Sequence, residues 1–193
     1  ALAESFGVSG PGWAKAIERG MMLRPLSGIE EGIASLSRDL GVALPAGERA
    51  ELARLWREAC RRTRLFEDVP RSLKRLSARY RLGLLSNTQS FDLEFLDEGM
   101  PGSLFRARLL SCHAGLLKPD PALFLRMAGM LQLEPSEILM VGDSLRDDVL
   151  GSEAVGMQAV LIRRQEAPLS FREPHPGRVP IRALAPLLEA LGA

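Results

Sequence analysis

A cluster of acidic residues follows an apolar run late in the chain. The string ILMVGDSLRDD holds four apolar residues, then Gly142, and then Asp143, Asp147 and Asp148. Carboxylates this close together repel one another unless a cation neutralises them. Mg²⁺ binds one or two carboxylates together with water and phosphate oxygens, so these residues are candidate magnesium ligands. The alternative is that Asp143 and Ser144 cap the next helix, whose first turn favours acidic side chains.

A lysine stands directly before a predicted helix in the string GLLKPDP. This residue, Lys118, is one of only three lysines among the 25 basic residues, and the remainder are arginine. A lysine ammonium is a compact charge on a flexible stem, which suits a site that must hold one phosphate oxygen. We therefore predict that Lys118 contacts a phosphate. A solvated surface lysine is the alternative.

Small polar residues end a second apolar run, in LGLLSNTQS. The run stops at Ser86, Asn87 and Thr88. A hydroxyl group and backbone amides at the end of a strand can hold a phosphate oxygen, so Ser86 and Asn87 are candidate substrate-binding residues. Serine and asparagine are also common in ordinary turns. Arg24, in the loop MMLRPLSG, is a further candidate for substrate binding, with a surface arginine as the alternative.

Alternating strands and helices must position these residues. Apolar runs predict strands over 81–87, 107–113, 137–143 and 157–163, with helices predicted over 69–80, 92–100, 118–133, 145–156 and 181–193. Such alternation predicts an α/β fold with a Rossmann-like parallel sheet and right-handed crossovers. Ligands bind beyond the carboxyl ends of the strands of such sheets. The serine and aspartate candidates, and also Ser111, stand at those ends.

The first third of the chain is predicted to be helical. Apolar residues recur at helical spacing over 27–41 and 46–62, with Ser27 and Glu30 forming a capping-box pattern and Gly41 a helix end. The domain division that follows is a small all-α domain over residues 1–64 and a Rossmann-like core over residues 65–193.

Composition excludes several classes of partner. The net charge is +1, which favours neither nucleic acid nor an acidic membrane surface as a partner. No apolar run has the length of a membrane span. Cys60 and Cys112 lack the spacing of metal ligands and indicate reduced thiols in a cytoplasmic protein. Cys112 and His113 are neighbours on a predicted strand, where adjacent side chains face opposite ways, which disfavours a catalytic pair.

The polar motifs also occur in a familiar order. GLLSNTQ, GLLKPDPALF and VGDSLRDDVLGSEAVGM resemble motifs II, III and IV of the haloacid dehalogenase (HAD) superfamily, in its phosphatase branch. The resemblance covers residues 65–165, and the helical first third is similar to the family's small cap. It implies that Ser86 binds the phosphoryl group and that Lys118 neutralises phosphate and nucleophile. It also implies that Asp143, with Asp147 or Asp148, holds Mg²⁺.

The family's first motif, Asp-x-Asp-Gly-Thr, does not occur in this sequence. That motif carries the nucleophile on the central strand, so the resemblance implies that both precede Ala1. The implied activity is Mg²⁺-dependent hydrolysis of a small phosphorylated metabolite, a phosphate monoester, through an aspartyl-phosphate. One alternative is a 2-haloacid dehalogenase, which needs no divalent metal and does not account for the acidic cluster. Another is a non-catalytic fragment or phosphate-binding module.

Overall fold

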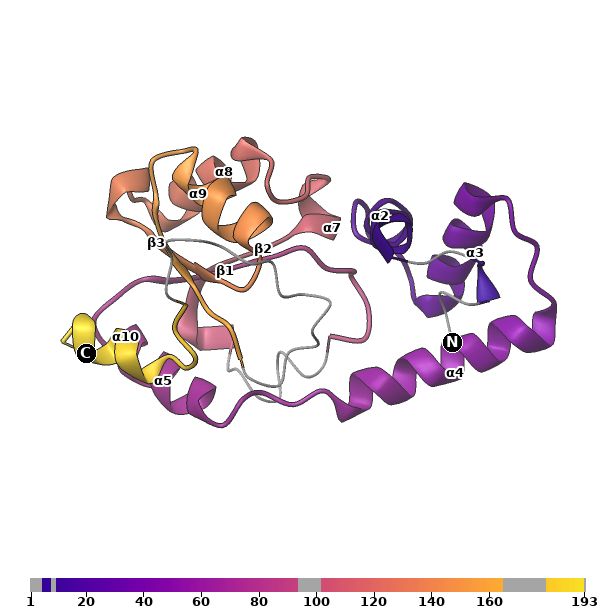
Figure 1. The fold of residues 1–193 in the computed structure, drawn as a ribbon, viewed down its shortest axis with the longest axis horizontal. Helices are drawn as coiled ribbons and strands as arrows, with labels where there is room; N and C mark the ends of the chain where they lie inside the picture. The colour runs from indigo at the N-terminus through magenta and orange to yellow at the C-terminus, as the bar shows by residue number, and fades with distance from the viewer. Residues whose placement is uncertain (1–4, 8–9, 94–101, 165–179, 193) are drawn as a thin grey trace. The chain divides into compact units, whose positions relative to one another are not determined.

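The computed structural model describes residues 5–7, 10–93, 102–164 and 180–192 (Figure 1). The chain divides into two compact units. The first unit contains Ala1–Arg64, Leu85–Gly102 and Leu109–Leu117, and the second contains Leu65–Leu84, Ser103–Arg108 and Lys118–Ala193. Most of the predicted helix over 92–100 and the proline-rich segment that carries His175 lie outside the described residues.

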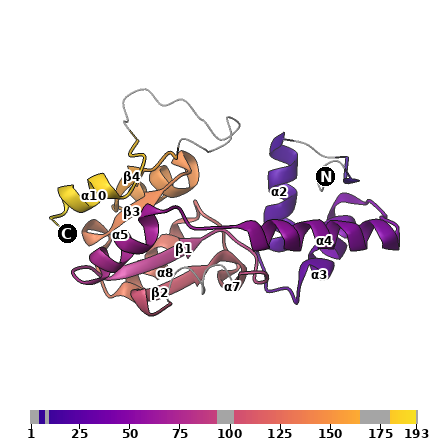
Figure 2. The same ribbon diagram turned by 90° about the horizontal axis from the view of Figure 1, so that it is seen from below.

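The part of the first unit up to Arg64 is helical, as its sequence predicts. It contains α2 (Gly10–Met21), α3 (Ile29–Leu40) and α4 (Ala46–Arg62), and α3 packs against both of the others (Figures 1 and 2). Ile29, Ile33 and Leu36 are buried on one face of α3, which confirms the apolar spacing read from the sequence. Gly41 ends the helix with φ 67°, a left-handed conformation that glycine adopts without steric cost.

The capping box predicted for α3 is wrong about the residue that pairs with Ser27. The helix begins at Ile29, so Glu31 rather than Glu30 turns back over the first turn. The backbone N–H and the hydroxyl of Ser27 donate to Glu31 Oε2 at 2.8 and 3.0 Å. These hydrogen bonds lower the pKa of Glu31. Glu30 instead forms an ion pair with Arg57 on α4.

The second unit is built of strands and helices. β1 (Leu82–Ser86) pairs with β2 (Phe105–Leu110), and β3 (Leu139–Gly142) pairs in parallel with β4 (Gln158–Leu161). The last two residues of β1 and of β2 belong to the first unit. Helices α8 (Pro121–Leu131) and α9 (Gly151–Glu153) lie on one side of the strands, and α5 (Asp68–Ser77) and α10 (Ala185–Ala190) lie on the other (Figures 1 and 2). Short 3₁₀ turns occupy Gly102–Leu104 and Pro135–Glu137. The α/β fold is therefore as predicted.

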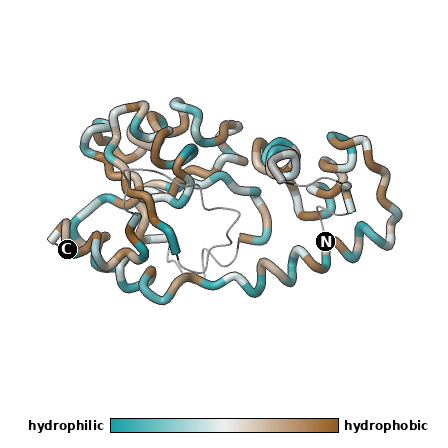
Figure 3. The backbone as a smooth tube through the Cα atoms, viewed as in Figure 1, coloured by the Kyte–Doolittle hydropathy of each residue, from teal (hydrophilic) through white to brown (hydrophobic). Residues whose placement is uncertain are grey.

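The described strands form two separate pairs rather than one continuous sheet. β3 and β4 are mostly hydrophobic along their length (Figure 3), as expected for strands covered by helices on both faces. Among the described residues, no helix is both long enough and apolar enough to span a bilayer.

The strand predicted over 107–113 is too long. β2 ends at Leu110, and Ser111–Ala114 form the short helix α7, closed by Gly115 at φ 70°. Local apolar spacing does not reveal this turn, in which the Gly115 N–H donates to the Ser111 carbonyl at 2.8 Å. Cys112 and His113 therefore lie on a short helix, and the expectation that a strand turns their side chains to opposite faces is wrong. Cys112 is buried, which raises the pKa of its thiol, whereas His113 is exposed.

An ion pair joins the start of α5 to the C-terminal part of the second unit. Asp68 accepts hydrogen bonds from Arg164 Nη1 at 2.6 Å and from the Leu184 N–H at 2.8 Å. The Arg164 guanidinium also lies over the Phe66 ring, 4.5 Å from its centroid. Burial acts to raise the pKa of Asp68, but these hydrogen bonds and the Arg164 charge outweigh it, so the pKa is lowered.

We expect Asp68→Asn to destabilise the protein by about 1–3 kcal/mol at neutral pH, because the variant loses a charge-assisted hydrogen bond. A lowered carboxyl pKa contributes stability above the unfolded-state pKa, near 3.8, that is lost as pH falls through the folded-state value. Urea unfolding at neutral pH and at acidic pH measures the difference in the free energy of unfolding between the wild type and the variant. The difference between the two proteins should shrink in acid, and a pH-independent difference would contradict the assignment.

Candidate active site

A buried ion pair lies at the centre of the predicted site in the second unit. Lys118 Nζ contacts Asp148 Oδ1 at 2.5 Å, and the two side chains are only 10% and 4% exposed. The Lys118 side chain is therefore mostly buried and paired rather than solvated. Burying an ion pair costs free energy, because each charge loses its hydration. The opposite charge and further hydrogen bonds must offset this loss.

The start of α8 fixes the backbone that carries Lys118. Asp120 caps the helix, with its Oδ1 accepting from the Ala122 N–H at 2.9 Å, and Pro121 is the first helical residue. Both features are as predicted. Leu123 and Phe124 are completely buried and anchor the helix in the unit's core. The Lys118 side chain thus extends from a backbone segment that is fixed by the start of α8.

Gly142 makes room for the acidic partner. A Cβ built at this position would lie 2.3 Å from the Cβ, Cγ and Oδ2 atoms of Asp148. Any larger residue would therefore displace the carboxylate from the end of β3. The Ser144 N–H donates to Asp148 Oδ2 at 2.9 Å, so both carboxylate oxygens have a partner. The glycine before Asp143, which the sequence shows only as the end of a strand, is explained by this close approach.

The segment after β3 is helical, as predicted, but begins with a wider turn. Over Leu145–Leu150 the hydrogen bonds follow a π-helical pattern, with the Val149 N–H donating to the Ser144 carbonyl at 3.2 Å. Ser144 caps this turn, since its Oγ accepts from the Asp147 N–H at 3.1 Å. The capping alternative is therefore correct for Ser144 but not for Asp143. Such π-helical turns often occur at functional sites.

The remaining carboxylates near the end of β3 fit a magnesium ion. Asp143 is exposed, and Asp147 is partly buried with its Oδ2 accepting from the Ser144 hydroxyl at 3.0 Å. The described part of the chain contains no group of three or more histidine, cysteine, aspartate or glutamate residues suited to a metal. Mg²⁺ does not need one, because one or two carboxylates suffice when water and substrate phosphate complete its coordination.

The other predicted residues belong to the first unit. Ser86 and Asn87 are partly buried at the end of β1. The next residue, Thr88, is held by Ser111: its N–H donates to Ser111 Oγ at 2.9 Å, and that hydroxyl donates to the Thr88 carbonyl at 3.1 Å. That Ser86 and Lys118 face one phosphoryl group stays a prediction.

The loop that carries Arg24 is tied to the same segment. Ser90 Oγ accepts from the Leu26 N–H and donates to the Leu26 carbonyl, both at 2.8 Å. Arg24 itself is exposed, and its Nη2 donates to the buried Ser35 Oγ at 3.1 Å. The structure therefore places part of the Arg24 guanidinium against α3, and its predicted contact with substrate stays untested.

Sequence reasoning missed an open cleft of about 500 Å³ within the first unit. Residues of the loop at 26–30 line it together with Arg57 and the segment 90–93. Its charged residues are Glu30, Arg57 and Asp92. They come from three separate segments without any shared motif, so the sequence holds no signal that would bring them together.

The second unit thus combines an α/β arrangement with a lysine–carboxylate pair and further acidic residues at the end of β3. The chain belongs to the haloacid dehalogenase-like hydrolase family, whose model matches residues 9–156. It is 38% identical over 60 residues to glyceraldehyde 3-phosphate phosphatase of Methanopyrus kandleri, which covers 31% of this chain and 26% of that protein. The chain thus spans only about a quarter of that relative's length.

Solved structures agree on the fold. A HAD phosphatase from Thermococcus onnurineus is similar with a TM-score of 0.62 and 27% identity, covering 81% of this chain and 69% of that one. L-2-haloacid dehalogenase from Xanthobacter autotrophicus has a TM-score of 0.63 at 21% identity, covering 100% and 91%. The enzyme BT-2542 from Bacteroides thetaiotaomicron, in complex with magnesium and inorganic phosphate, has a TM-score of 0.61 at 18% identity, covering 89% and 84%. The last two likenesses show the fold alone.

Proposed function

We propose that the complete protein is a Mg²⁺-dependent phosphatase that hydrolyses a small phosphate monoester. The observation that carries this proposal is the buried Lys118–Asp148 pair beside Asp143 and Asp147 at the end of β3. The phosphatase names of its relatives support it. In this proposal residues 1–64 act as the cap that selects the substrate, and residues 65–193 supply the core. A cytoplasmic location is part of the proposal, since the two cysteines form no disulfide.

The proposed chemistry divides between this chain and an aspartate that precedes Ala1. That aspartate attacks the phosphorus atom, and the bond to the leaving alkoxide breaks as the aspartyl-phosphate forms. Water then hydrolyses the aspartyl-phosphate, and the proton that this water loses balances the one that the alkoxide takes up to become the alcohol. Lys118 stabilises the charge on the transferring oxygens, because its ammonium is held in a site with little water. Asp148 holds that ammonium in place through the ion pair. Asp143 and Asp147 would hold Mg²⁺, which supplies further positive charge to the phosphoryl group.

The dehalogenase alternative is retained because the family that matches this chain also takes its name from haloacid dehalogenases. Halide displacement needs a carboxylate nucleophile but no divalent metal. The two activities therefore differ in metal dependence and in product. The acidic residues around Ser144 favour the phosphatase.

A comparison of two proteins tests the function. The complete product of the gene should hydrolyse p-nitrophenyl phosphate with Mg²⁺ and lose activity with EDTA, whereas the chain beginning at Ala1 should be inactive. Mg²⁺-dependent turnover by the shorter chain would overturn the placement of the nucleophile. Halide release from 2-chloropropionate without metal would instead establish the dehalogenase, and inactivity of the complete protein would favour the binding module.

The metal site has its own test. Asp143→Asn should weaken Mg²⁺ binding by the complete protein by well over tenfold, because a neutral amide replaces an exposed carboxylate ligand. Asp39→Asn, at an exposed position on α3, is the matched control and should leave the affinity unchanged. Calorimetric titration with Mg²⁺ measures both. Equal affinity in the two variants would exclude Asp143 as a ligand.

A further inference from the structure

Ser111 is a completely buried hydroxyl whose hydrogen bonds go to a single residue. Its relative exposure is 0%, and its Oγ both accepts from the Thr88 N–H and donates to the Thr88 carbonyl. A buried hydroxyl must be hydrogen-bonded, since leaving one unpaired costs the full free energy of its desolvation. Here the partner is the backbone of a loop rather than a helix or a sheet.

The contact fixes the segment predicted to hold phosphate. The Thr88 N–H belongs to the peptide that joins Asn87 to Thr88, and the Thr88 carbonyl belongs to the following peptide. Ser111 therefore restrains two successive peptide planes, beginning one residue after Ser86. The direction of backbone N–H groups decides whether such a turn can bind an anion.

Ser111 is itself rigidly held. It follows β2, whose last residues Leu109 and Leu110 are 4% and 7% exposed, and it opens the short turn that Gly115 closes. The far side of the loop is held differently, because Gln89 Nε2 donates to the Phe91 carbonyl at 3.2 Å and Ser90 bonds to Leu26. Ser111 thus acts on the side of the loop nearest to Ser86.

We propose that Ser111 is a positioning residue for the phosphate-binding turn formed by Ser86, Asn87 and Thr88. This inference rests on the proposed phosphatase function. Ser111 touches no substrate, and it acts by orienting the backbone that does. A misplacement of about 1 Å in such a group can reduce rate up to hundredfold, so Ser111→Ala should lower affinity for inorganic phosphate by roughly tenfold or more.

Two measurements test the role. Amide hydrogen exchange at Thr88, in the chain itself, should become faster in Ser111→Ala because its N–H loses its acceptor. Binding of inorganic phosphate by the complete protein with Mg²⁺ should weaken in the same variant. Ser111→Thr, which keeps the hydroxyl, should restore slow exchange at Thr88 and much of the phosphate affinity.

Ser152 offers a matched control in the second unit. It is also 0% exposed, and its Oγ donates to the Val149 carbonyl at 3.0 Å. Ser152→Ala should lose a similar amount of stability without changing Thr88 exchange or phosphate affinity. If Ser111→Ala speeds exchange but binds phosphate as the wild type does, the positioning role is wrong and Ser111 is only structural. If the complete wild-type protein binds no phosphate, the result contradicts the proposed function and, with it, the positioning role of Ser111.

Discussion

Lys118→Arg is expected to lower the kcat of the complete protein by roughly 10²–10³, the loss typical of one transition-state donor. Arginine keeps the positive charge, but its planar guanidinium is larger and directs its donors differently from an ammonium. The lysine side chain is only 10% exposed and fills a site bounded by the Asp148 carboxylate. A larger head group cannot take the same position there. Steady-state kinetics with p-nitrophenyl phosphate at saturating Mg²⁺ measures the loss.

Lys74→Arg is the internal control for this experiment. Lys74 is exposed on α5, so its replacement should leave kcat and the stability unchanged. Circular dichroism of both variants checks that the fold is retained. Similar activity in the two variants would show that Lys118 does not contact the reacting phosphoryl group.

The second large effect is on stability. Replacing Asp148 by alanine should destabilise the chain by about 3–5 kcal/mol, because it leaves the Lys118 ammonium buried without its counter-charge. Lys118→Met should be destabilising for the converse reason. The double replacement of both residues by apolar ones should lose less than the sum of the single effects, since no unpaired charge remains. Urea unfolding of the four proteins gives the coupling free energy.

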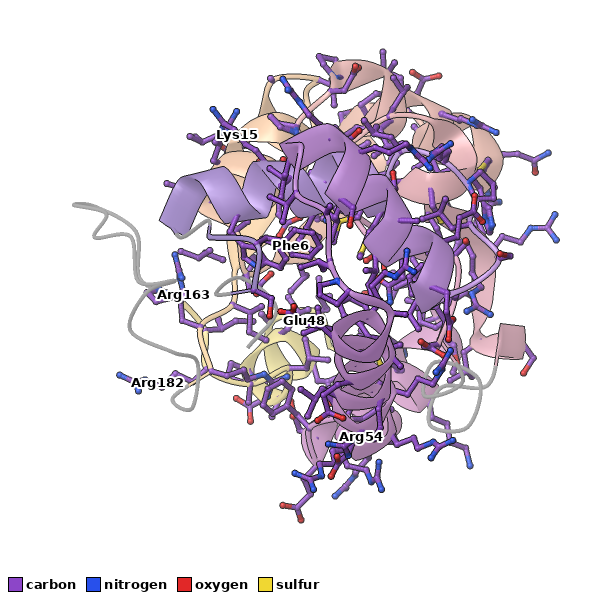
Figure 4. The ribbon with its side chains drawn as sticks, turned by 90° about the vertical axis from the view of Figure 1, so that its right-hand side faces the viewer. Phe6, Lys15, Glu48, Arg54, Arg163 and Arg182 are labelled. Atoms are coloured by element: carbon purple, nitrogen blue, oxygen red, sulfur yellow. The ribbon has the colours of Figure 1, made fainter. Side chains whose placement is uncertain are left out.

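An exposed ion pair in the same chain provides the comparison. Arg54 on α4 (Figure 4) contacts Glu51 at 2.7 Å, with side chains 59% and 54% exposed. Solvent screens such a pair, so Glu51→Gln should not change stability measurably. Equal effects at the two pairs would mean that the Lys118–Asp148 pair is hydrated and not the buried pair described above.

The sequence by itself determined most of the strands and helices and the candidate residues. Apolar runs predict the four strands because a strand covered on both faces must be apolar along its length. The Asp120–Pro121 pair predicts the start of α8, because a capping side chain and a fixed φ act within a few residues. The scarcity of lysine singles out Lys118 as a candidate functional residue. All of these signals are local, so the order of residues is sufficient to read them.

Only the tertiary structure decided which residues meet. Among the three aspartates after β3, Asp148 forms the ion pair with Lys118, which lies thirty residues earlier in the chain. Gly142 leaves the space that the Asp148 side chain occupies. Ser111 meets Thr88 across 23 residues because the sequence predicted as a strand turns into a helix at Leu110. Contacts of this kind depend on the path of the backbone between the two residues and on the volume left between packed elements. Neither quantity is encoded in the spacing of a motif, so the pairing of these side chains appears only when the chain is folded.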